Sequence, residues 1–117
     1  MKPMLNLPTV LALYPDAAGR RAFLEMSVAH ARADLAAIRQ AVETGDYVQA
    51  RQQTHRAKGT VGFLSTDPDA TRLLDALTEA LRAGDAARIA LAHAPVEASL
   101  ARLEAELLRQ ISDLPAA

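Results

Sequence analysis

Apolar residues recur at alternating spacings of three and four through most of this 117-residue chain. That is the period of a helix burying one face, and no stretch alternates apolar and polar residues for long, as a half-buried strand would. The clearest stripes run through residues 24–42, 47–64, 70–81 and 89–111. The chain therefore predicts an all-α fold whose core is built from amphipathic helices.

Proline, glycine and aspartate divide the chain into five expected helices. A short helix opens at Pro8 and stops near Tyr14. Gly45-Asp46 and Gly84-Asp85 each combine a helix stop with a possible N-cap. The longer helices are expected from a cap at Asp16 to about Thr44, from about Tyr47 to Leu64, from about Ala70 to Ala83, and after Asp85 with a stripe ending at Ile111.

The connections between these helices are short, with Ser65–Asp69 expected as a loop. Pro95 lies inside the last helix and should kink or split it, because proline cannot donate a hydrogen bond to the preceding turn. Long amphipathic helices with short connections predict an antiparallel four-helix bundle, with the first short helix as a lid. The length suits one domain over residues 1–117.

Composition and charge narrow the classes of function. The formal net charge is −1, whereas nucleic-acid binders usually carry a strong basic excess, so we expect no nucleic-acid partner. The chain has no cysteine, which excludes disulfides and thiolate metal sites. Residues 1–15 contain no long apolar run, so they predict neither a signal peptide nor a membrane anchor, and we expect a cytoplasmic protein.

One face of the third expected helix carries chemistry instead of core residues. At about 100° per residue, and with His55 taken as zero, Lys58 lies near −60°, Gly59 near +40° and Gly62 near −20°. The buried stripe is centred roughly 130° away by the same arithmetic. Each glycine costs roughly 0.8–1 kcal/mol relative to alanine. Two glycines on an exposed face therefore indicate that another surface approaches the backbone beside His55.

The charges near His55 suit a phosphoryl group or a partner with an acidic pocket. No acidic residue occurs between Asp46 and Asp67, whereas Arg51, Arg56 and Lys58 do. An imidazole near neutral pH can accept a phosphoryl group through one ring nitrogen. Catalysis would then consist mainly of positioning and charge neutralisation.

The neighbours of His55 have candidate roles in such a site. Lys58, one turn on, can steady the phosphoryl oxygens, and Gln52, one turn before, can hold the imidazole by a hydrogen bond. Arg51 and Arg56 are either candidate contacts to a partner or solvated surface charges. Two explanations are open for Gly62, access for a partner surface or tight packing between helices.

Residues 55–60, His-Arg-Ala-Lys-Gly-Thr, match the His-x-x-Lys-Gly-small signature of histidine-containing phosphotransfer (HPt) domains, and the resemblance extends from about Leu7 to Ile111. It implies that His55 is phosphorylated at Nε2 by the aspartyl phosphate of a receiver domain and passes the group to another receiver aspartate. Lys58 and Gly59 carry over from the motif. The resemblance also implies no kinase activity of its own, with Mg²⁺ bound by the receiver.

The chain departs from the family pattern in three places. Ala57 stands where many members have leucine or isoleucine, Ser65 where many have glycine, and the Ser65–Asp69 loop looks slightly longer than usual. Phosphorylated histidines also occur in histidine kinase dimerisation helices, where an acidic residue typically follows in place of Arg56. The phosphorylated domain of chemotaxis kinases, which shares the His-x-x-Lys-Gly pattern, is a closer rival.

Two other functions compete with the phosphocarrier. One is a docking or regulatory module that binds receivers without taking phosphate. The other is a metalloprotein using His30, His55 and His93, although no two of them have the three- or four-residue spacing of a helical metal motif. We expect no metal site and a monomer. The partners would be response-regulator or hybrid-kinase receiver domains. They would contact the second and third expected helices, residues 16–44 and 47–64.

Overall fold

The computed structural model describes residues 4–115, so both ends of the expected domain, residues 1–3 and 116–117, lie outside it. The described chain is all-helical and compact. Its helices are α1 (Leu7–Leu13), α2 (Ala17–Glu43), α3 (Tyr47–Leu64), α4 (Pro68–Ala83) and α5 (Ala86–Ser112). The prediction of an all-α chain with five helices is confirmed.

Aspartate caps begin the four longer helices. The carboxylate of Asp16 accepts a hydrogen bond from the amide of Gly19 at 2.7 Å, and Asp46 accepts from Gln49 at 3.1 Å. Asp85 begins α5 in the same way. Each cap satisfies a backbone N–H that has no partner within the helix. Two predicted stops adopt the left-handed backbone that glycine tolerates best, with φ of 74° at Gly45 and 66° at Gly84.

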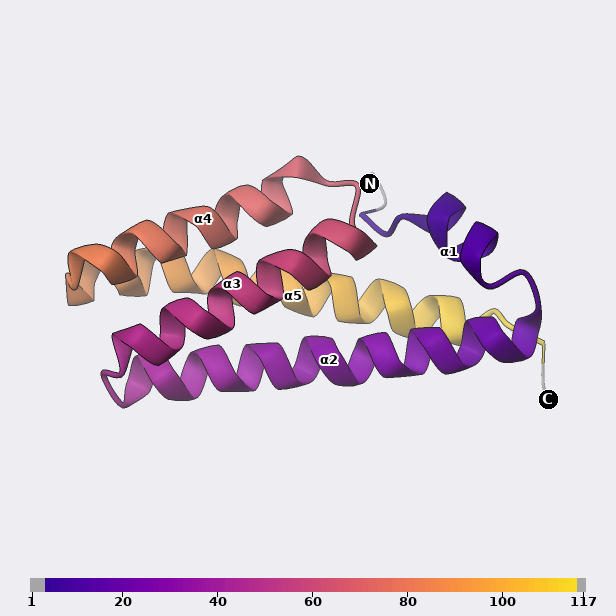
Figure 1. The fold of residues 1–117 in the computed structure, drawn as a ribbon, viewed down its shortest axis with the longest axis horizontal. Helices are drawn as coiled ribbons and strands as arrows, with labels where there is room; N and C mark the ends of the chain where they lie inside the picture. Colours follow the sequence, from indigo (N-terminus) through magenta and orange to yellow (C-terminus); the bar gives the residue numbers. More distant parts are fainter. Residues whose placement is uncertain (1–3, 116–117) are drawn as a thin grey trace.

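The four longer helices lie side by side, and each packs against two others (Figure 1). α3 packs against α2 and α4, and α5 packs against the same two helices from the other side. Leucine and isoleucine fill the centre, where they are removed from water. The largest fully buried aliphatic side chains include Leu24, Ile38, Leu77, Ile89, Leu103 and Leu107.

The segment before α2 covers the end of the molecule that α3 and α4 do not reach (Figure 1). The backbone near Met4 and Leu5 pairs with the end of α3, and the amide of Asn6 donates to the carbonyl of Leu64 at 2.6 Å. Val10 of α1 is buried in the core. These contacts fix the C-terminal end of α3, the helix that carries His55.

Two proline-containing segments differ from the sequence expectations. The predicted Ser65–Asp69 loop is shorter, because α4 begins at Pro68 and Asp67 is its N-cap. Proline is favoured at a first helical position, where its missing N–H has no partner to lose. Of the kink or split expected at Pro95, the split is wrong, since α5 continues from Ala86 to Ser112. Buried residues on both sides of Pro95, Ile89 and Val96, hold the two parts against the core.

No helix within residues 4–115 is both long enough and apolar enough to cross a membrane.

Candidate functional site

His55 lies on the exposed side of α3, as the helical spacing predicts. The opposite side of the helix is closely packed, with Ala50, Thr54 and Ala57 almost completely buried. The buried Thr54 hydroxyl has a hydrogen-bond partner, because it donates to the Ala50 carbonyl at 2.7 Å. Small core residues therefore seat α3 close to its neighbours and leave the imidazole of His55 at the surface.

A groove runs between α3 and α4 and contains His55. We call it the α3–α4 groove, and its volume is about 750 Å³. Its walls are formed by Val48, Arg51, Gln52, His55, Arg56 and Lys58 of α3 and by Asp75, Thr78, Glu79 and Arg82 of α4. Five of the seven residues singled out on α3 from the sequence thus line one groove.

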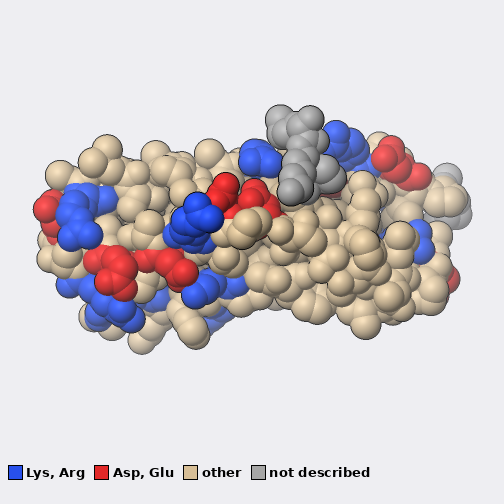
Figure 2. Space-filling model, turned by 90° about the horizontal axis from the view of Figure 1, so that it is seen from above, with Lys and Arg blue, Asp and Glu red and all other residues tan. Residues whose placement is uncertain are grey.

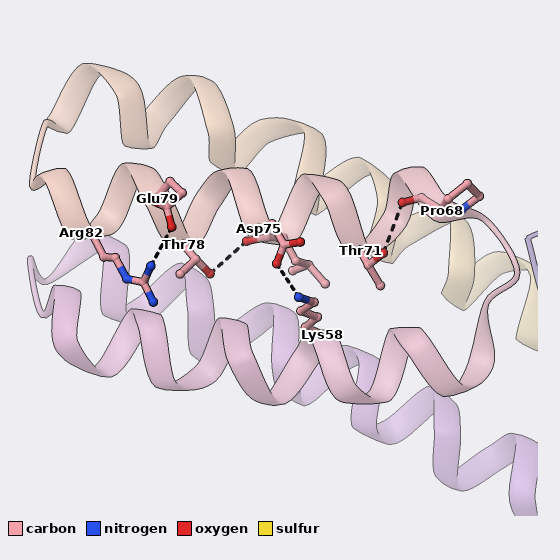
Figure 3. A network of polar contacts seen from close by, with 8 residues as sticks. Lys58, Pro68, Thr71, Asp75, Thr78, Glu79 and Arg82 are labelled. Carbon is pink, nitrogen blue, oxygen red and sulfur yellow. Dashed lines mark hydrogen bonds and ion pairs between the residues drawn. The ribbon is translucent and has the colours of Figure 1, made fainter.

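Lys58 crosses this groove to α4. Its Nζ lies 2.7 Å from Asp75 Oδ1, and the two side chains are 45% and 56% exposed (Figure 3). Further along the same helix, Arg82 pairs with Glu79 one turn away at 2.7 Å. An exposed pair of this kind contributes little to stability, so its main effect is on where the lysine ammonium points.

The groove is not as basic as the sequence of α3 predicts. Residues 47–64 contain no acid, but α4 places Asp75 and Glu79 in the same groove. Over this part of the molecule acidic and basic groups alternate, without a large patch of one sign on the face shown (Figure 2). The groove keeps a basic excess, with four Arg or Lys side chains against two acids, but the sequence overestimated it. The prediction counted charges along one helix, whereas a groove between helices takes charges from both.

The imidazole of His55 has no hydrogen-bond partner among the described residues, and this includes Gln52. Gln52 lines the groove but does not hold the ring in the way proposed from the sequence. An imidazole without a partner keeps a nitrogen lone pair available to an incoming electrophile. Arg51 and Arg56 line the same groove and form no ion pair with a described residue.

The two glycines are not required by packing within the chain. A Cβ on Gly59 would meet nothing within 4 Å, and one on Gly62 would touch only the Thr71 methyl at 3.9 Å, an ordinary contact. Alanine would fit at both positions and would favour the helix. The alternative of tight helix packing therefore has no support at Gly62, and both positions stay open to an approaching surface.

On its other side, Gly59 borders an apolar depression that the sequence did not reveal. We call it the α2–α3 hollow, and it is lined by Phe23, Met26, Ser27, His30, Gly59, Thr60, Phe63 and Leu64. Met26 is 51% exposed and Phe63 is 47% exposed. Both residues lie off the buried stripes, which is the signal that could have identified them.

Aromatic stacking stiffens this hollow. The Tyr14 and Phe23 rings stack with centroids 4.5 Å apart, and Phe23 meets Phe63 edge-on at 6.3 Å. Such pairs add about 0.5–1.5 kcal/mol beyond their buried area. The exposed ring of Phe63 therefore packs against Phe23 of α2, which is itself stacked on Tyr14 at the end of α1.

α2 also carries a buried carboxylate. Asp34 of α2 is only 8% exposed, and burial raises the pKa of its carboxyl, while the positive charges of His30 and Arg56 act in the opposite direction. Burial disfavours the charged form of an acid. Asp34 thus lies within electrostatic reach of Arg56, the residue that follows His55.

The three histidines lie on three helices, with His30 on α2, His55 on α3 and His93 on α5. Within residues 4–115 no three His, Cys, Asp or Glu side chains gather as a metal site would need. His93 Nε2 is buried without a hydrogen bond, 3.5 Å from Glu97 Oε1. Arg39 also binds that carboxylate and holds the pKa of Glu97 below its ordinary value.

Comparisons of the chain with protein-family models, with curated proteins and with solved structures find no match.

Proposed function

We propose that this chain is an HPt domain, an antiparallel four-helix bundle with a short N-terminal helix, and that His55 carries a phosphoryl group between receiver domains. The observation that supports this most directly is the exposed imidazole, which has no hydrogen-bond partner within residues 4–115, on a helix whose two nearby glycines are not needed for packing. A structural histidine would be expected to have a partner or a packed position.

In the proposed reaction, the Nε2 lone pair of His55 attacks the phosphorus of a receiver aspartyl phosphate. The P–O bond to the aspartate breaks, and the carboxylate leaves with the electron pair while Nδ1 keeps its proton. Lys58, one turn away, offers an ammonium to the phosphoryl oxygens. The Mg²⁺ that the chemistry needs belongs to the receiver, so the chain is a phosphocarrier without kinase activity of its own.

The α2–α3 hollow supports a receiver as the partner. Transient signalling interfaces are small and have an apolar centre with a polar rim. Met26 and Phe63 supply such a centre beside Gly59, and Arg56 and Lys58 belong to the rim. The sequence predicts that a receiver contacts α2 and α3. On α2, the candidate contact residues are Phe23, Met26 and His30, which line the hollow.

The decisive test is phosphoryl uptake. The chain is incubated with phosphorylated receiver domains and Mg²⁺, and its mass is followed for the gain of one acid-labile phosphoryl group. We expect a gain in the wild type and none in His55→Gln, whose circular dichroism should be unchanged because the side chain is exposed. His93→Gln is the matched control and should retain uptake, because His93 lies outside both the α3–α4 groove and the α2–α3 hollow. Uptake by His55→Gln would contradict the proposal.

The second candidate function is a docking module that binds receivers without taking phosphate. It is favoured by one observation, that His55 is not among the residues lining the α2–α3 hollow. Such a module would bind a receiver equally well after His55→Ala and would show no phosphoryl gain from any donor.

A further inference from the structure

We propose that Asp75 is a positioning residue for phosphoryl transfer, acting through Lys58. This inference rests on the proposed function of His55. Asp75 lies on α4, whereas the residues assigned to the chemistry lie on α3, so it is not part of the His-x-x-Lys-Gly motif. The relevant contact is the 2.7 Å ion pair between Lys58 Nζ and Asp75 Oδ1 (Figure 3).

The ion pair is distinctive because it joins two helices across the groove that contains His55. The other pairs made by α4, Arg72 with Asp69 and Arg82 with Glu79, link residues one turn apart on the same helix. Among the described residues, the Lys58–Asp75 pair is therefore the one ion pair that restrains a side chain of α3. Both of its members line the α3–α4 groove.

A lysine needs such a restraint to act on a neighbouring phosphoryl group. Its four-carbon stem is flexible, and an unrestrained ammonium three residues from His55 would spend much of its time in solvent. Residues three apart on a helix face each other, so an ammonium held over the groove stays near the imidazole. The ammonium has three N–H donors, and one bond to Asp75 leaves two for phosphoryl oxygens.

This role makes a prediction that a structural role for Asp75 does not. If Asp75 acts through Lys58, removing the carboxylate slows transfer only while the lysine is present. The two substitutions are then non-additive, as expected for groups that act as a unit. If Asp75 only supports α4, its loss has the same effect with or without Lys58.

The experiment measures the first-order rate of phosphoryl transfer at saturating phosphorylated receiver, together with receiver affinity. We expect Asp75→Ala to slow transfer about fivefold, the upper range for one exposed charge pair, with affinity unchanged. Asp75→Glu should restore part of the rate. In a Lys58→Met background, Asp75→Ala should have no further effect.

Asp69→Ala is the matched control, since Asp69 is also an ion-paired acid of α4 but lies outside the α3–α4 groove. It should leave the rate unchanged. An unchanged rate in Asp75→Ala, or an equal loss in the Lys58→Met background, overturns the role of Asp75 and leaves His55 as the carrier. A wild-type chain that takes no phosphoryl group overturns the proposed function and this inference together.

Discussion

The α3–α4 groove and the α2–α3 hollow flank the same helix but differ in chemistry. The groove holds His55 and is lined by paired and unpaired charges, including Lys58 and Asp75. The hollow is lined by exposed apolar side chains such as Met26 and Phe63 and contains no residue of the ion pairs. Under the proposed function this difference corresponds to a division of roles, in which the hollow would bind the receiver and the groove would hold the transferred phosphoryl group.

The helical period explains how one helix serves both sides. Lys58 and Gly59 are adjacent in sequence but lie about 100° apart around the helix axis, so one points to the groove and the other to the hollow. His55 lies between these directions by the same geometry. A partner seated in the hollow can therefore extend over Gly59 towards the imidazole.

The largest expected effect that tests this division is on binding. We expect Phe63→Ala to weaken receiver affinity about tenfold, as the loss of an exposed aromatic anchor does. The transfer rate within the complex should change little. Titration of the receiver at constant ionic strength separates the two quantities.

The control for this binding prediction is Leu91→Ala on α5, where Leu91 is 77% exposed and outside the hollow. Its affinity should equal that of the wild type. A Phe63→Ala variant with normal affinity and a slow transfer step would show that the hollow belongs to the chemistry, and the division would be wrong.

A smaller effect is expected on stability at the glycine between the two sides. Gly59→Ala should stabilise the fold by about 0.8–1 kcal/mol, since alanine favours a helix and its Cβ would meet no described atom within 4 Å. Urea unfolding measures this change. Gly59→Leu should keep the stability but hinder receiver binding, because its side chain would enter the hollow.

Gly62→Ala is the matched control for Gly59, since its Cβ would meet only an ordinary contact with Thr71. It should also stabilise the fold. If Gly59→Leu bound receivers as tightly as the wild type, the glycine would have no role in partner approach.

The smallest effect is expected at Asp34 and depends on pH. Burial raises the pKa of this carboxyl in the folded chain. The folded chain therefore holds the proton more tightly than the unfolded chain does. Stability then falls as pH rises from the ordinary carboxyl range through the raised value, because the unfolded chain ionises first.

We therefore expect Asp34→Asn to be more stable than the wild type near neutral pH by less than about 1 kcal/mol, since the charge of Arg56 offsets part of the cost of burying the carboxylate. The difference should vanish at a pH below the ordinary carboxyl range, where both chains are neutral at this position. Urea unfolding at the two pH values measures it. A gain that persists in acid would show that the amide packs better and that ionisation is not the cause.

Local signals in the sequence determined most of the fold. The three-four spacing of apolar residues and the capping aspartates predicted α2 and α3 closely, because both signals act within one or two turns of a helix. Pro68 and Pro95 were less well interpreted. Proline is compatible with a first turn, and in a helix interior its cost can be offset by packing that the sequence does not display.

The sequence by itself also determined the exposed face that carries His55, Lys58 and Gly59, because helical geometry fixes the angles between residues of one helix. Only the tertiary structure decided what stands beside that face. Asp75 and the apolar Phe23 and Met26 come from other helices, and their positions depend on how those helices pack. Periodicity along one helix contains no information on the rotation of its neighbours, which is set by side-chain interdigitation across the core.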